Sequence, residues 1–216
     1  MEDPLEVSQR PEDAPRPLGC CDEGTKQWGK DVRTPIPGAP GHRERIDDAY
    51  ERHGTGTLCM MVEPLAGQRE VRVTERRTAV DSAEAIQHRG DVRAPRAETM
   101  VLVPDNLHTH TLASLYEAFP PQEARRLIDT LEGHYTPKHG RWLHRAEIEL
   151  GVLRRQCLDR RVPDFSTLTD KVAAWQSDRN AVQVKVPWQF TTADARVQLK
   201  RLYPILEPIK NKWTDH

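Results

Sequence analysis

The feature that most constrains the fold is a continuous apolar run, TMVLV at residues 99–103, that ends at Pro104 and Asp105. A β-branched run without polar alternation is typical of a strand that is buried on both faces, and such strands occur in parallel sheets covered by helices. The run therefore predicts an α/β domain in which a carboxylate follows the carboxyl end of a central strand.

Patterns on either side of this run supply further elements. Strand signals are present over 57–65 and over 70–75, the second with strict alternation, and LAGQ between them predicts a hairpin turn. Apolar residues at helical spacing predict helices over 78–86, 112–119, 124–131, 143–157, 166–180 and 192–203, and 134–137 is predicted as a short strand. Frequent glycine and proline predict a long irregular connection over 24–48.

The chain is expected to hold one domain with short extensions. We expect a disordered leader over 1–17, because this segment is rich in Pro, Glu and Asp and has few apolar residues, a single domain over 18–204 and a C-terminal tail over 205–216. No apolar stretch is long enough for a membrane span or a signal-peptide core, so a cytoplasmic location is expected. The four cysteines lack zinc-knuckle spacing and are interpreted as reduced thiols.

Charge is distributed unevenly along the chain. Residues 1–134 contain 17 Lys and Arg against 24 Asp and Glu, whereas residues 135–216 contain 15 against 9. A basic C-terminal third suits a protein that places one face on a polyanion such as nucleic acid, although solvated charge of either sign is common in proteins that bind none.

Three acidic residues occupy positions from which they could share one metal site: Asp22 after LGCC, Asp105 after the buried run, and Glu147 early in the best predicted helix. Parallel strands would put the two aspartates side by side, and a helix across the sheet would bring the glutamate over them. Carboxylate oxygens suit Mg²⁺, and a pair of such ions can drive phosphoryl chemistry. The alternative is that all three are ordinary solvated acids, and helical periodicity cannot choose between Glu147 and Glu149.

Several blocks of the sequence, taken together and in order, resemble a known family. They are LGCCDE (18–23), the segment 50–81, VLVPDNLHTH (101–110), LYEAFPPQEARRL (115–127), the segment 134–161 and WQFTTADARVQLKRLYP (188–204). This combination resembles the catalytic domain of bacterial insertion-sequence transposases of the six-thirty family, which are related to the mariner elements and carry a DDE superfamily endonuclease domain.

The resemblance implies an α/β, ribonuclease H-like fold with a mixed central sheet flanked by helices. It also implies metal-dependent DNA cleavage and strand transfer with Mg²⁺, for which Mn²⁺ can substitute. It matches Asp22, Asp105 and Glu147 to the family's catalytic metal ligands and so favours Glu147 over Glu149. The implied partners are DNA, as transposon ends and target in a nucleoid-associated setting, and a second copy or a full-length transposase.

Departures from the family pattern leave a second interpretation open. The chain has His144 where the family usually has Asn, and Pro104 where an apolar residue is usual, which could shift the neighbouring carboxylate. The family's N-terminal helix-turn-helix region finds no match in the chain. The alternative is a catalytically inactive transposase remnant that binds DNA or a full-length transposase.

Two further clusters carry weaker signals. The segment 138–145 mixes cationic side chains with an aromatic ring, which suits contact with DNA phosphates and an unpaired base, or else forms a solvated turn around a core tryptophan. The residues expected at DNA are Lys138, His139, Arg141, Trp142 and Arg145. His108 and His110 have the spacing of a transition-metal pair, which leaves a metallohydrolase as a third alternative.

Overall fold

The computed structural model describes residues 2–43, 45, 47–105, 112–136 and 144–203. Its strands are β1 (Leu18–Asp31), β2 (Tyr50–Glu63), β3 (Gln68–Thr74), β4 (Met100–Pro104) and β5 (Leu131–Gly133). Its helices are α1 (Glu2–Ser8), α2 (Ala79–His88), α3 (Ala113–Ala118), α4 (Pro121–Asp129), α5 (Arg145–Gln156), α6 (Phe165–Ala181) and α7 (Thr192–Gln198). A π-helical turn, η1 (Arg89–Arg93), and a 3₁₀ turn, η4 (Lys200–Leu202), complete the order.

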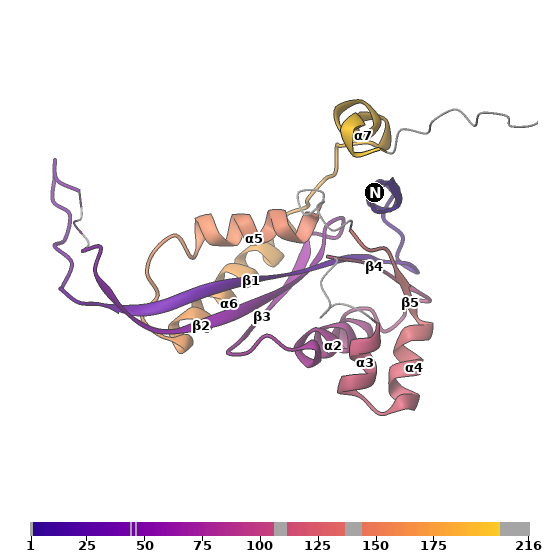
Figure 1. The fold of residues 1–216 in the computed structure, drawn as a ribbon, viewed down its shortest axis with the longest axis horizontal. Helices are drawn as coiled ribbons and strands as arrows, with labels where there is room; N and C mark the ends of the chain where they lie inside the picture. The colour runs from indigo at the N-terminus through magenta and orange to yellow at the C-terminus, as the bar shows by residue number, and fades with distance from the viewer. Residues whose placement is uncertain (1, 44, 46, 106–111, 137–143, 204–216) are drawn as a thin grey trace, which may run out of the picture.

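The five strands form one mixed sheet in the order β3-β2-β1-β4-β5 (Figure 1). The pairs β1–β2 and β2–β3 are antiparallel, whereas β1–β4 and β4–β5 are parallel. Every residue of β4 is buried, which confirms the prediction drawn from its continuous apolar run. The hairpin turn predicted between β2 and β3 is also confirmed, and Gly67 adopts a positive φ of 68° there.

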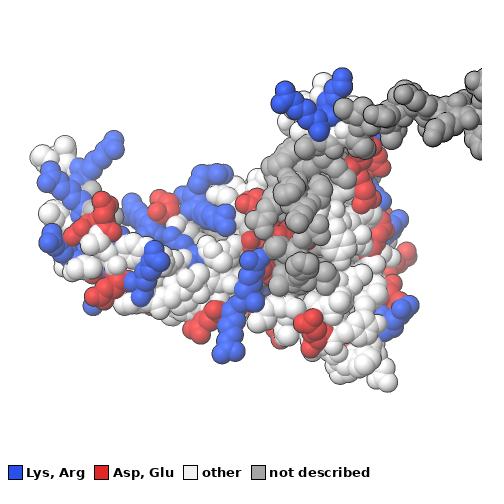
Figure 2. Space-filling model, in the orientation of Figure 1, with Lys and Arg blue, Asp and Glu red and all other residues white. Residues whose placement is uncertain are grey.

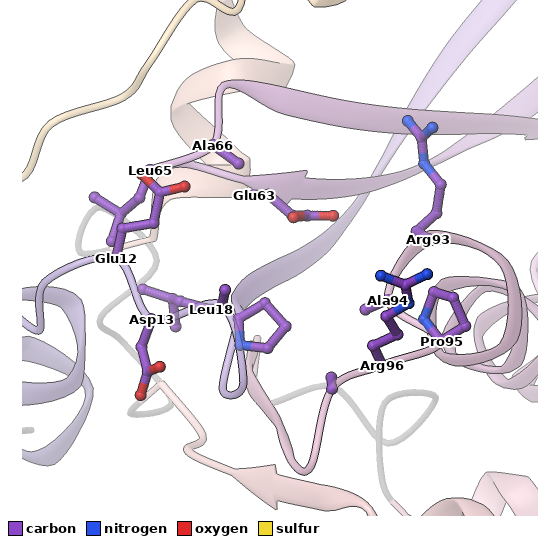
Figure 3. A pocket seen from close by; sticks show the side chains of 13 residues that line it. Glu12, Asp13, Leu18, Glu63, Leu65, Ala66, Arg93, Ala94, Pro95 and Arg96 are labelled. Atoms are coloured by element: carbon purple, nitrogen blue, oxygen red, sulfur yellow. The ribbon is translucent and has the colours of Figure 1, made fainter.

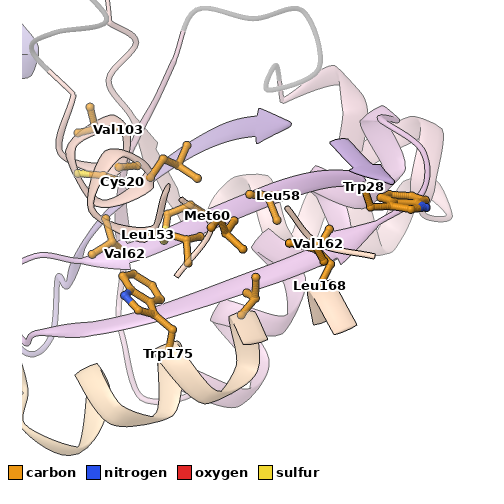
Figure 4. Close-up of a cluster of buried hydrophobic side chains, with 14 of the residues drawn as sticks. Cys20, Trp28, Leu58, Met60, Val62, Val103, Leu153, Val162, Leu168 and Trp175 are labelled. Carbon is orange, nitrogen blue, oxygen red and sulfur yellow. The ribbon is translucent and has the colours of Figure 1, made fainter. Parts of the chain in front are cut away.

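Helices cover both faces of the sheet (Figure 1). On one face α5 and α6 pack on the central strands around a core that includes Leu58, Met60, Leu150, Leu153 and Trp175 (Figure 4). On the other face α2, α3 and α4 enclose a second core. Burial of apolar side chains on both faces holds the central strands, and thus the residues at their ends, in fixed positions.

The long irregular connection predicted over 24–48 is wrong in its first part, because β1 continues to Asp31 and pairs with β2 from Cys20 to Asp31. A glycine of the neighbouring strand β2 makes room for an aromatic side chain of β1. The ring of Trp28 lies against Gly54, where an added Cβ would stand 2.4 Å from the ring. The outer halves of β1 and β2 with the residues between them form an arm that projects beyond the helices (Figure 1), here called the β1–β2 arm.

Two other expectations are corrected. The leader predicted to be disordered contains α1, whose Leu5 and Val7 are each 1% exposed. Leu5 packs with Ala195 of α7, so α1 buries its apolar side chains against an element that is distant in sequence. The short strand predicted at 134–137 lies instead at Leu131–Gly133, while the tail 205–216 lies outside the described residues. Within the part of the chain that the structure describes, no helix has the length and apolarity to cross a membrane.

Candidate active site

The two aspartates predicted to lie side by side do so. Parallel pairing of β1 with β4 aligns Cys21 with Pro104, and the next residues along the two strands are Asp22 and Asp105. The amide nitrogen of Asp105 donates a hydrogen bond to the Cys21 carbonyl oxygen at 3.2 Å. The exposed fractions of the two aspartates are 0% and 1%, so both carboxylates lie in a region shielded from bulk water.

Pro104 is accommodated without displacing Asp105. The amide of Met100 donates toward the β5 side of β4, to Thr130, whereas those of Val101 and Asp105 donate toward β1. Because donors alternate along a strand, the nitrogen of Pro104 faces the β5 side, past the residue where β5 ends. Proline therefore removes a donor beyond the end of that ladder, and its own carbonyl still accepts from Thr136 at 3.2 Å.

The third carboxylate comes from α5, which packs against β1 and β2. Glu147 lies in the first turn of this helix, and its side chain is 35% exposed. The pKa of Asp22 is raised to about 8, first by burial, then by its hydrogen-bonding interaction with the Glu147 carboxyl and by the negative charge of Asp105. The three acids are therefore close enough for their charges to oppose one another.

Glu149 has a different environment from Glu147. It is 1% exposed, and its carboxylate lies 3.0 Å from Nε of Arg69 on β3 and 2.9 Å from Nη2 of Arg179 on α6. Two residues along a helix turn the side chain through about 200°, so these two acids serve opposite sides of α5. Glu149 ties α5 to β3 and α6, while Glu147 faces Asp22.

Backbone hydrogen bonding engages only one oxygen of Asp22. Its Oδ1 accepts from the amide nitrogen of Glu23 at 2.7 Å, whereas its buried Oδ2 accepts no hydrogen bond from any residue that the structure describes. Buried carboxylate charge of this kind is costly unless a cation or donors compensate it. A divalent cation would supply that compensation, so the donor set fits a metal ion that takes oxygen ligands.

The described residues do not yet form a closed metal site. Among them, no three His, Cys, Asp or Glu side chains are placed closely enough to hold one ion together. Holding an ion would require the carboxylates of Asp22, Asp105 and Glu147 to rearrange.

Two polar residues beside this site were not among the predicted metal ligands. Glu23 points to the opposite face of β1, where it accepts a hydrogen bond from the Ser82 hydroxyl at 2.9 Å and pairs with Arg77, so it fixes β1 against α2. His144 precedes the first turn of α5, is 0% exposed, and lies with Nδ1 3.9 Å from Oδ2 of Asp22. The His-x-x-Glu spacing at the helix start was the available signal, since positions three apart share a helix face.

The predicted DNA-contacting segment is described only at its end. Lys138, His139, Arg141 and Trp142 lie outside the described residues, as do His108 and His110. Arg145 is 2% exposed, and its guanidinium donates to the Ser8 carbonyl oxygen and stacks on the Trp188 ring at 5.8 Å. The charged group of Arg145 is thus buried between α1 and the segment before α7, and contact of this residue with DNA stays a prediction.

Basic side chains nevertheless lie near the carboxylates. The Arg154 guanidinium lies over Gly24 of β1 and 3.8 Å from Glu147, and Arg155 and Arg160 are exposed farther along. Figure 2 shows Lys and Arg side chains over this helix and along the β1–β2 arm. The name α5 arginine face is used here for Arg154 and Arg155 of α5 together with Arg160, which follows the end of the helix.

One pocket among the described residues lies away from the carboxylates. It has a volume of about 340 Å³ and lies near the start of β1, between the segment before that strand and the segment after η1 (Figure 3). Acidic and basic side chains both line it, among them Glu12, Glu63, Arg93 and Arg96. Because Leu18 lines the pocket and Asp105 lies at the other end of the β1–β4 pair, this cavity is separate from the candidate site.

A sequence model described as DDE superfamily endonuclease matches residues 17–169. No curated protein matches the chain. Among solved structures, the chain is similar to the Mos1 mariner paired end complex with Mn, at 13% identity, 83% coverage of this chain, 54% of that chain and a TM-score of 0.56. It is also similar to the Mos1 strand transfer complex, at 11% identity, 78% coverage of this chain, 50% of that chain and a TM-score of 0.53. The chain thus spans about half the length of these Mos1 chains, and the likeness confirms the ribonuclease H-like fold.

Proposed function

The chain belongs to the DDE superfamily endonuclease family, and from that premise we propose that it is a transposase catalytic domain related to the six-thirty insertion-sequence and mariner enzymes. Its reaction would be cleavage of DNA phosphodiester bonds at transposon ends, followed by joining of the freed 3′ end to a target strand. The observation that carries this proposal is the convergence of three carboxylates at the carboxyl end of β4, one of which has a buried oxygen with no hydrogen bond from a described residue.

In this proposal Asp22, Asp105 and Glu147 hold Mg²⁺, with Mn²⁺ as a substitute. When bound, such ions activate a water or hydroxyl and stabilise the leaving oxygen at phosphorus. The protein's own contribution is placement. The strand pairing fixes the two aspartates in register, and the amide of Glu23 orients Asp22 so that its other oxygen faces the site. Burial removes competing water from both aspartates.

The α5 arginine face supports a DNA partner. Its guanidinium groups can bind backbone phosphates without regard to base sequence, and Arg154 lies beside Glu147, where a scissile strand would enter. Lys138, His139, Arg141 and Trp142 would extend this contact. Assembly as a homodimer or with a full-length transposase, and a nucleoid-associated location in the cytoplasm, belong to the same proposal.

A nicking assay on supercoiled plasmid DNA in Mg²⁺ or Mn²⁺ tests this function. Asp105→Asn preserves side-chain size but removes a metal-binding charge, so we expect nicking by the wild type and none by the variant. The exposed-helix variant Asp129→Asn is the matched control and should nick as the wild type does, because it lies on α4 away from the site. Equal nicking by the wild type and Asp105→Asn would refute the assignment.

One observation favours the second candidate, a catalytically inactive transposase remnant. The described carboxylates are near one another but do not form a group that could hold an ion without rearrangement. A remnant would still unfold cooperatively and bind DNA weakly through the α5 arginine face, yet it would neither nick DNA nor respond to Mn²⁺. DNA binding that is lost in Arg154→Ala, together with no nicking in either metal, would support this candidate.

A further inference from the structure

The site contains an imidazole that oxygen-only metal chemistry does not require. We propose that His144 is a metal ligand beside Asp22, so that this site selects transition-metal ions such as Co²⁺ or Zn²⁺ over Mg²⁺. This inference rests on the proposed function, because it assumes that Asp22 belongs to a metal site. It adds a nitrogen donor and a different metal preference to the three carboxylates.

The orientation of the ring is fixed by one hydrogen bond. Nε2 of His144 lies 2.7 Å from the carbonyl oxygen of Val103 on β4. A carbonyl can only accept, so Nε2 carries the proton and Nδ1 is the nitrogen that can coordinate a metal in the neutral ring. Metal-binding histidines commonly donate their second ring nitrogen to a backbone carbonyl or a carboxylate in this way, because the bond fixes both tautomer and ring plane.

The separation from Asp22 suits two ligands of one ion. Nδ1 of His144 and Oδ2 of Asp22 are 3.9 Å apart, which exceeds an ordinary hydrogen bond. Ligand atoms each about 2.1 Å from an ion lie about 3.0 Å apart at a right angle and about 4.2 Å apart when opposite. The observed distance falls within that interval, so an ion could lie between the two atoms with little movement of either.

The electrostatic surroundings of Asp22 and His144 favour binding of a cation. Oδ2 of Asp22 is buried and receives no hydrogen bond from the described residues, and the carboxylates of Asp105 and Glu147 add negative charge nearby. His144 and Glu147 are three residues apart at the start of α5 and therefore share the helix face that lies over β1. Imidazole nitrogen is a favoured ligand of Co²⁺ and Zn²⁺, whereas Mg²⁺ prefers oxygen.

Two substitutions separate coordination from packing. His144→Gln can keep a donor near the position of Nε2, and so the bond to Val103, while it removes the nitrogen at Nδ1. His144→Asn instead keeps a polar atom near the position of Nδ1 and offers an amide oxygen, which suits Mg²⁺. Unfolding of each variant without metal, followed by circular dichroism, checks that the fold is retained before any titration.

The test is titration of the intact protein with CoCl₂, followed by the visible absorption of Co²⁺, and with MgCl₂, followed by calorimetry. We expect His144→Gln to bind Co²⁺ at least about tenfold more weakly than the wild type, the scale of loss when a ligand or its support is removed, with a smaller change for Mg²⁺. We expect His144→Asn to retain Mg²⁺ binding and to lose the preference for Co²⁺.

The outcomes distinguish failure of this inference from failure of the proposed function. If the wild type and His144→Gln bind both ions equally while Asp22→Asn binds neither, the carboxylate site stands and the role of His144 is refuted. Tighter binding by His144→Gln than by the wild type would also refute it, because the imidazole would then be excluding the ion. If the wild type binds neither ion, both the inference and the metal-dependent function fail.

Discussion

Glu147 and Glu149 lie two residues apart on one helix, and their replacement by glutamine should have opposite consequences. Glu149 compensates the charge of Arg69, whose side chain is 0% exposed, and also pairs with Arg179. Removing one member of a buried ion pair typically costs about 3–5 kcal/mol, because the other charge stays buried without its partner. For a chain of this size that loss corresponds to a fall of roughly 6–20 °C in the unfolding midpoint.

Glu147→Gln removes a negative charge that opposes ionisation of Asp22, so the metal-free variant should be at least as stable as the wild type. The effect of Glu147→Gln should appear instead in the presence of metal, as the absence of stabilisation by Mn²⁺. Urea unfolding without metal measures the first effect, and thermal unfolding with and without Mn²⁺ measures the second. If Glu149→Gln costs less than about 1 kcal/mol, or if Glu149→Gln rather than Glu147→Gln abolishes the metal response, the division of roles between these two acids is wrong.

Two further predictions concern stability. Arg10 and neighbouring cations lower the pKa of Glu132 to about 2. The stability that the ionised Glu132 adds to the folded state is therefore complete above about pH 4.5 and is lost as the pH falls toward 2. Because the side chain is 26% exposed, Glu132→Gln should reduce the acid-induced loss of unfolding free energy between pH 5 and pH 2 by only about 1 kcal/mol, as measured by urea unfolding. Gly54→Ala should cost about 1–3 kcal/mol because its Cβ would meet the Trp28 ring at 2.4 Å, whereas Gly24→Ala, which meets a movable arginine side chain, should cost less than about 1 kcal/mol. If thermal unfolding shows similar losses of stability for Gly54→Ala and Gly24→Ala, packing of the Trp28 ring is not the reason that position 54 requires glycine.

The sequence predicts the centre of the fold well because β4 carries a pattern with a single interpretation. An unbroken apolar run of this length is typical of a strand that is buried on both faces, and that burial places Asp105 at the end of a central strand. The helix of Glu147 is equally clear from its apolar stripe. The pairing of Asp22 with Asp105 follows once both strands are known to be parallel.

Elements whose stability depends on distant partners were mispredicted. β1 contains glycines and polar residues that suggest a loop, and only its pairing with β2 and the contact of Trp28 with Gly54 make it a strand. The helix α1 is acidic and proline-containing, yet Leu5 is buried against a residue of α7 nearly two hundred positions away. Local propensity cannot report contacts of that sequence separation.

The candidate site shows the same limit. Helical periodicity leaves Glu147 and Glu149 equivalent, because each borders the apolar stripe of α5. Only the positions of Arg69 and Arg179 on other elements show which acid is engaged in an internal ion pair. The burial of Arg145 was hidden for a related reason, since its partners, Ser8 and Trp188, come from the two ends of the chain.

The most direct test of the central claim is thermal unfolding of the wild type and Asp105→Asn with and without Mn²⁺. An ion present at about a hundred times its dissociation constant stabilises the folded state by about 2.7 kcal/mol, which should raise the wild-type midpoint by roughly 5–11 °C. We predict that rise in the wild type and none in Asp105→Asn. A cooperative wild-type transition that Mn²⁺ leaves unchanged would contradict a metal site formed by Asp22, Asp105 and Glu147.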